Sequence, residues 1–121
     1  MQRFTNLKVW QEGHALVLDI YRVSRSFPPD ERFGVTSQLR RAATSVPTNI
    51  AEGSKRRSNA EFARFLNIAE GSLAETEYLV MLARDLHYVA PDVSRSLLER
   101  STELAQMLNA LRLRVEREAR L

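Results

Sequence analysis

The stretch LLERSTELAQMLNALRLRV, residues 97–115, carries the strongest pattern in the chain. Its apolar residues recur at alternating spacings of four and three, the period of a helix that buries one stripe against other helices. One polar residue interrupts the stripe, which consists of Leu97, Ser101, Leu104, Leu108, Leu111 and Val115. The pattern predicts a long amphipathic helix over about residues 93–118.

Three further helical patterns precede this one, over about residues 7–26, 31–52 and 59–88. Four amphipathic helices joined by short turns pack most simply as antiparallel neighbours. We therefore predict an all-α, antiparallel up-and-down four-helix bundle, formed as a single domain by residues 1–121. The apolar faces are broad, and two interpretations stay open: a fully filled core, or a homo-oligomer whose interface uses the excess.

Polar residues mark the helix starts. Thr5 or Asn6 is the expected cap of the first helix, because short polar side chains accept hydrogen bonds from the free amides of a first turn. Ser58 and Glu61 have the spacing of a capping box, in which each side chain accepts from the other residue's backbone N–H. The third helix is therefore predicted to begin at residue 59. Ala90-Pro91-Asp92 separates it from the fourth.

Proline and glycine mark the expected irregularities. Pro47 lies inside the second pattern and removes a backbone donor, so a kink or a break is expected near Ser45–Val46. Gly53 is predicted to stop that helix. Gly71 lies in the middle of the third helix, where glycine is unfavourable, and its expected use is the close approach of another helix.

Composition excludes several classes of function. The chain has no cysteine, which excludes disulfides and thiolate chemistry and fits a reducing cytosol. The first residues are polar, and no apolar run is long enough to span a membrane, so a cytoplasmic protein without a membrane partner is expected. Neither histidine, His14 or His87, follows a glutamate by three positions or an arginine by four to six. We predict no enzyme activity, no catalytic residue, no metal site and no cofactor.

The polar residues that remain gather around the second helix and the turn after it. Residues 1–64 carry 11 basic against 6 acidic side chains, whereas residues 65–121 carry 7 against 9. Such a basic surface can hold backbone phosphates, or it can be an ordinary solvated face whose charges pair with nearby acids. The candidate nucleic-acid-binding residues are Arg40, Arg41, Lys55, Arg56, Arg57 and Arg64.

Several segments, in order, resemble one known family. They are residues 4–11 (FTNLKVWQ), 20–21 (IY), 27–28 (FP), 38–43 (QLRRAA), 49–53 (NIAEG) and 65–73 (FLNIAEGSL). Together they resemble the bacterial four-helix-bundle proteins first noticed as reading frames inside 23S rRNA intervening sequences. The match runs from about Phe4 to Val89, and the seam of the fourth helix completes it.

This resemblance implies an up-and-down four-helix bundle that assembles as a ring-like homopentamer. The fold is also similar to the accessory variability protein of diversity-generating retroelements, a basic pentamer that binds nucleic acid and partners a reverse transcriptase. The resemblance therefore implies RNA, DNA or a protein such as a reverse transcriptase as partners. The family's polar motif corresponds to Gln38, Arg40, Arg41, Asn49, Glu52 and Gly53 here. These residues form either a surface site or a buried network in which Glu52 pairs with an arginine and joins the second helix to the third.

Overall fold

The computed structural model describes residues 3–121, and this part of the chain is helical, without strands. Its elements are η1 (Phe4–Asn6), α1 (Lys8–Ser24), η2 (Pro29–Glu31), α2 (Val35–Ser54), α3 (Asn59–Asp85) and α4 (Pro91–Ala119), where η marks a short 3-10 helix. The prediction of an all-α bundle of four helices is confirmed. The observed helices differ from the predicted ranges by up to four residues at their ends.

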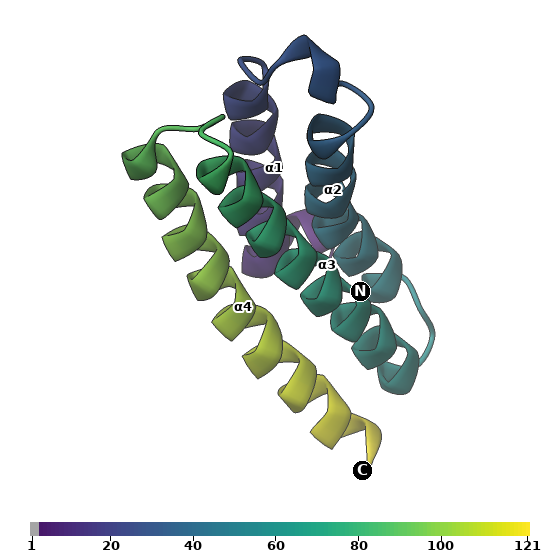
Figure 1. Ribbon diagram of the computed structural model, residues 1–121. Coiled ribbons are helices and arrows are strands. Elements are labelled where there is room, and N and C mark those ends of the chain that lie inside the picture. The colour runs from purple at the N-terminus through teal and green to yellow at the C-terminus, as the bar shows by residue number, and fades with distance from the viewer. Residues whose placement is uncertain (1–2) are drawn as a thin grey trace.

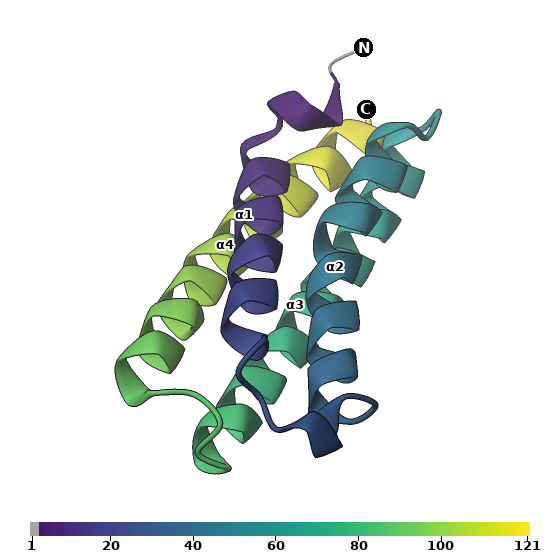
Figure 2. The same cartoon turned by 90° about the horizontal axis from the view of Figure 1, so that it is seen from above.

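The helices contact one another in chain order, α1 with α2, α2 with α3 and α3 with α4, and α1 closes the bundle against α4. Consecutive helices run in opposite directions (Figure 1). The α2–α3 turn and the C-terminus therefore lie at the same end of the bundle (Figure 2). That end carries most of the candidate site.

The core consists of aliphatic side chains from all four helices. The most completely buried large ones are Leu16, Ile20, Val46, Ile50, Leu66, Leu73, Val80 and Leu108. The seam of residues 97–115 faces this core as predicted, with Leu111 only partly buried. Its polar member, Ser101, is fully buried and donates to the carbonyl of Leu97 at 2.8 Å. A buried hydroxyl satisfied within its own helix costs little, so the seam tolerates it.

The predicted cap of the first helix is wrong. Thr5 and Asn6 belong to η1, and the residue that precedes α1 is Leu7, whose side chain makes no capping hydrogen bond. At α3 the prediction is partly confirmed, because the Ser58 hydroxyl accepts from the Glu61 N–H at 3.2 Å. The Glu61 carboxylate instead accepts from the Arg64 Nε at 2.8 Å. Only half of the capping box therefore forms.

Pro47 does not break α2, which runs without interruption from Val35 to Ser54. Pro47 is buried and faces Gly13 of α1, where a methyl group would lie 3.7 Å from the proline ring. Side-chain donors also reach carbonyls in the preceding turn, with Thr48 Oγ1 bonded to Thr44 at 2.8 Å and Asn49 Nδ2 to Ser45 at 2.8 Å. Neither bond reaches the Ala43 carbonyl, to which residue 47 would donate, so the packing of Pro47 against α1 is the contact that offsets the missing backbone donor. The milder alternative, a kink, stays a prediction.

Neither of the two glycines has, within this chain, the role predicted for it. Gly53 lies within α2 and does not stop it, since the helix continues to Ser54. A methyl group on Gly53 would lie 2.6 Å from Cβ of Phe65, so glycine is required for α3 to approach α2 here. Gly71 has nothing within 4 Å of the place a methyl group would occupy. It is therefore not a site of close helix packing within this chain.

Candidate nucleic-acid interface

The structure separates the predicted basic residues into two groups. Arg40 and Arg41 lie in the first half of α2, whereas Lys55 and Arg56 begin the turn after it. Arg41 and Lys55 are 14 positions apart in sequence, which along a helix is about 21 Å. The two groups of basic residues therefore lie well apart along α2.

Arg40 is bound to the end of α1. Its Nε donates to the buried hydroxyl of Ser24 at 2.9 Å, and its Nη2 donates to the carbonyl of Tyr21 at 3.3 Å. The guanidinium also lies over the Tyr21 ring, 4.6 Å from the ring centre. These contacts use two of the donors and one stacking face of the side chain, so Arg40 joins α1 to α2. Arg41, the next residue, is exposed.

A polar network does join α2 to α3, but with different residues from those expected. The hydroxyls of Ser45 and Ser72 lie 2.8 Å apart, and Asn49 Nδ2 donates to Ser45 Oγ at 2.9 Å. Glu52 is exposed and forms no ion pair with any residue in 3–121. Of the family motif, Asn49 therefore takes part in a network between the helices, whereas Glu52 and the exposed Gln38 do not.

The α2–α3 turn presents three exposed basic side chains, Lys55, Arg56 and Arg57, none of which forms an ion pair within the described residues. The guanidinium of Arg56 lies 4.7 Å from the centre of the Phe65 ring, and that of Arg64 lies 5.0 Å from it. Phe65 itself is only 8% exposed. We call Lys55, Arg56, Arg57, Arg64 and Phe65 the basic turn.

The position of Phe65 depends on Gly53, because a side chain on Gly53 would occupy the space of the Phe65 Cβ. The hydrogen bond from Arg64 to Glu61, followed by the charges of Arg64 and Arg56, lowers the pKa of the Glu61 carboxyl. One acid therefore offsets part of the charge of the basic turn. No sequence pattern indicated the contact of two arginines with Phe65, because it forms only when the turn folds Arg56 back onto α3.

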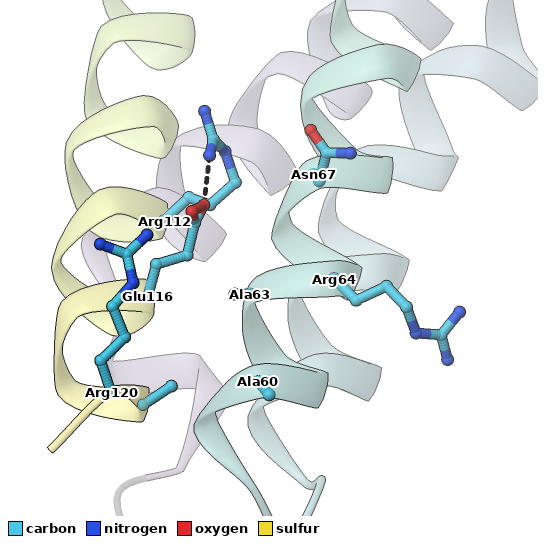
Figure 3. Close-up of a pocket in the computed structure, with 8 residues that line it drawn as sticks. Ala60, Ala63, Arg64, Asn67, Arg112, Glu116 and Arg120 are labelled. Atoms are coloured by element: carbon cyan, nitrogen blue, oxygen red, sulfur yellow. Dashed lines mark hydrogen bonds and ion pairs between the residues drawn. The ribbon is translucent and has the colours of Figure 1, made fainter.

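An open groove runs beside the basic turn, between the first half of α3 and the last turns of α4. It has a volume of about 550 Å³ and is lined by Ala60, Ala63, Arg64, Asn67, Arg112, Glu116, Ala119 and Arg120 (Figure 3). Arg112 pairs with both Glu70 and Glu116 and clamps α4 onto α3. The bonds to Glu70 and Glu116 raise the pKa of the Arg112 guanidinium above its ordinary value. The sequence alone did not indicate this groove.

Neither histidine belongs to either surface. His14 is exposed and stacks on Trp10, with ring centres 5.0 Å apart. His87 has a φ of 64° and lies just beyond the end of α3, with the next N–H, of Tyr88, bonded to the Ala83 carbonyl at 2.9 Å. Across residues 3–121, no cluster of three or more histidine, aspartate or glutamate side chains is suited to hold a metal ion. No helix in the same range is long and apolar enough to cross a membrane.

The fold and its surfaces define a class of small, all-α four-helix bundle proteins with a basic turn at one end. Residues 5–110 match the family model of the 23S rRNA-intervening sequence protein. The chain therefore belongs to that family, and the resemblance noted from its motifs is confirmed.

Similar structures support this assignment. One is a crystal structure of a protein of unknown function, from the S23 ribosomal protein family of Bacteroides thetaiotaomicron. It matches with a TM-score of 0.77 and 27% sequence identity, over 85% of this chain and 96% of that one. No curated protein matches the chain.

Proposed function

We propose that this chain is a non-enzymatic, homo-oligomeric bundle protein that binds RNA or DNA through the basic turn. The observation that carries the proposal is the placement of Arg56 and Arg64 against Phe65, with Lys55 and Arg57 exposed beside them. Guanidinium planes held over an aromatic ring lose little further freedom when they bind. They can contact phosphates, and unstacked bases can stack on them.

The contrast with Arg40 supports the choice of this surface over the first half of α2. Arg40 already donates from Nε to Ser24 and from Nη2 to Tyr21 and stacks on the Tyr21 ring, so a phosphate would meet only its remaining N–H groups unless it displaced those bonds. Lys55 and Arg57 have no such competitor among the described residues. The basic turn is therefore the better phosphate-binding surface.

An exposed apolar face supports the homo-oligomer. On α3, Ile68, Tyr78 and Met81 are 41%, 60% and 38% exposed, and Gly71 between them has open space in front of it. We call these four residues the α3 face. Exposed large apolar side chains on one helix are candidates for an interaction site, and the family resemblance implies a ring of five. Light scattering tests this: a pentamer has five times the chain mass of 13.9 kDa, whereas a monomer at micromolar concentration contradicts it.

Nucleic-acid binding is tested by fluorescence anisotropy with a structured RNA at rising salt. Each phosphate that the protein no longer neutralises should reduce the slope of log K against log salt by about 0.7–0.9. Arg56→Glu with Arg57→Glu should weaken binding and flatten that slope. The matched control is Arg95→Glu, an exposed arginine at the opposite end of the bundle. Absence of binding by the unaltered protein at low salt contradicts the proposal.

A second candidate function is a protein–protein adaptor that does not bind nucleic acid. The α3 face favours it, because the same exposed apolar side chains can bind a different protein, of which a reverse transcriptase is one example. Pull-down with Tyr78→Glu and with the Arg56→Glu, Arg57→Glu variant separates the two functions. An adaptor loses its partner only in the first variant, and a nucleic-acid binder loses its ligand in the second.

A further inference from the structure

The groove between α3 and α4 differs in chemistry from the basic turn beside it. Three of its lining residues, Ala60 and Ala63 on α3 and Ala119 on α4, have only a methyl group, which leaves the groove open. Its volume of about 550 Å³ is within the range of roughly 300–1,000 Å³ that small-ligand pockets occupy. A group of the size of a nucleotide base falls within this size class.

The charges of the groove do not favour a phosphate. Arg112 is neutralised by the two carboxylates that hold it, and Arg64 pairs with Glu61. Arg64 also points away from α4 (Figure 3). Within residues 3–121 the one lining guanidinium without a carboxylate partner is that of Arg120, which stands on the same wall as the carboxylate of Glu116. A neutral group that carries donors and acceptors suits this environment better.

The groove does offer such hydrogen-bonding groups. Within residues 3–121 the side-chain amide of Asn67 and the guanidinium of Arg120 make no hydrogen bond, and Glu116 uses only one carboxylate oxygen, on Arg112. Asn67 stands on the α3 wall, and Arg120 and Glu116 stand on the α4 wall (Figure 3). An amide, a carboxylate and a guanidinium are the side-chain groups that read the edges of nucleic-acid bases.

We propose that this groove binds an unpaired base of a single strand whose phosphates lie on the basic turn. The proposal rests on the proposed function and names its ligand class, single-stranded nucleic acid. Arg64 connects the two surfaces, because it covers Phe65 in the basic turn and also lines the groove. The basic turn then supplies the salt-dependent part of the affinity, and the groove supplies the part that depends on the base.

The test compares a single-stranded RNA of about 12 nucleotides with the same backbone without bases, a length within the range of known single-strand sites. The unaltered protein should bind the strand with bases about tenfold more tightly, as expected for hydrogen bonds to one base edge. Asn67→Ala, and separately Ala119→Phe from the opposite wall, should remove most of that advantage and leave the salt slope unchanged. Gln106→Ala, at an exposed position of α4 that does not line the groove, is the matched control. Melting curves confirm that each variant is folded.

The outcomes distinguish the two proposals. If the protein binds neither strand, the proposed function fails and the groove proposal fails with it. If it binds both strands equally, or if both groove variants keep the full advantage of the strand with bases, the groove proposal is overturned and binding by the basic turn stands. A changed salt slope in Asn67→Ala also overturns it, because that result would place a phosphate in the groove.

Discussion

Arg40 and Arg56 belong to similar stretches of sequence, since each is followed directly by a second arginine. Arg40 is bound to the end of α1 through Ser24 and Tyr21. Arg56 lies on the face of Phe65 and has no anionic partner among residues 3–121. A basic pair in a sequence therefore does not specify a ligand site. A basic pair is free to bind a ligand only where neighbouring helices do not already engage its side chains. Variants at the two ends of α2 can test this difference.

The largest effect is expected from Gly53→Ala, at the end of α2 where the arginines are free. The new methyl group would lie 2.6 Å from Phe65 Cβ, so α3 must move away from α2. Overpacking of this kind costs about 1–3 kcal/mol. Urea denaturation measures the loss, and binding by the basic turn should weaken with it. The control is Gly71→Ala, which has open space and should stabilise α3 by up to ~1 kcal/mol. Equal effects of the two changes would contradict the assigned roles.

Arg40→Ala tests the end where the arginine is bound. It removes two hydrogen bonds and the contact with the Tyr21 ring, for an expected loss of about 1–2 kcal/mol in the free energy of unfolding. Arg41→Ala removes the same charge from an exposed neighbour and should change stability by less than about 0.5 kcal/mol. Nucleic-acid binding should be affected little by either change. If Arg40→Ala abolishes binding in a folded protein, Arg40 belongs to the site and the contrast between the two arginine pairs fails.

His87→Gly extends the comparison to the two ends of α3. Ser58 caps its first turn, whereas the strained residue His87 follows its last turn. A side chain at a φ of 64° is unfavourable by about 1 kcal/mol, and glycine relieves this strain. Thermal unfolding should shift upward, without a change in binding. An unchanged or lower melting temperature would show that the histidine side chain contributes contacts that offset its backbone strain.

The smallest effect is expected from Glu77→Gln, on α3 between the two ends. Burial raises the pKa of the Glu77 carboxyl above its ordinary 4.5, and no ion pair within residues 3–121 stabilises its charge. The folded state therefore holds this proton to a higher pH than the unfolded state. The free energy of unfolding falls as the pH rises from about 4.5, the ordinary pKa, through the raised pKa of the folded state. Glu77→Gln should be more stable than the unaltered protein at neutral pH and equal to it at about pH 4. Melting curves against pH measure the difference, and a gap that persists in acid contradicts the assignment.

Part of the candidate site could be predicted from its residues. Lys55, Arg56 and Arg57 follow a helix end, and exposed basic side chains are expected in such a turn. The bond from Ser58 to the third helix was also predictable, because capping depends on residues three positions apart. The bond between Arg40 and Ser24 could not be predicted, since the two residues are 16 positions apart and only the packing of α1 on α2 brings them together. The contact of Arg56 with Phe65 and the groove beside it depend on packing in the same way.

The number of helices, their order and the side of the fourth helix that faces the core were all readable from the amino-acid sequence. These properties follow from local periodicity and from turn residues, which act over a few positions. Only the folded bundle settled which glycine is crowded, which arginine is bound and where a groove stays open. Each of these depends on the distance between helices, here between Gly53 and Phe65 or between Arg112 and Glu70. Residues far apart in the chain set those distances together, so no local pattern could predict them.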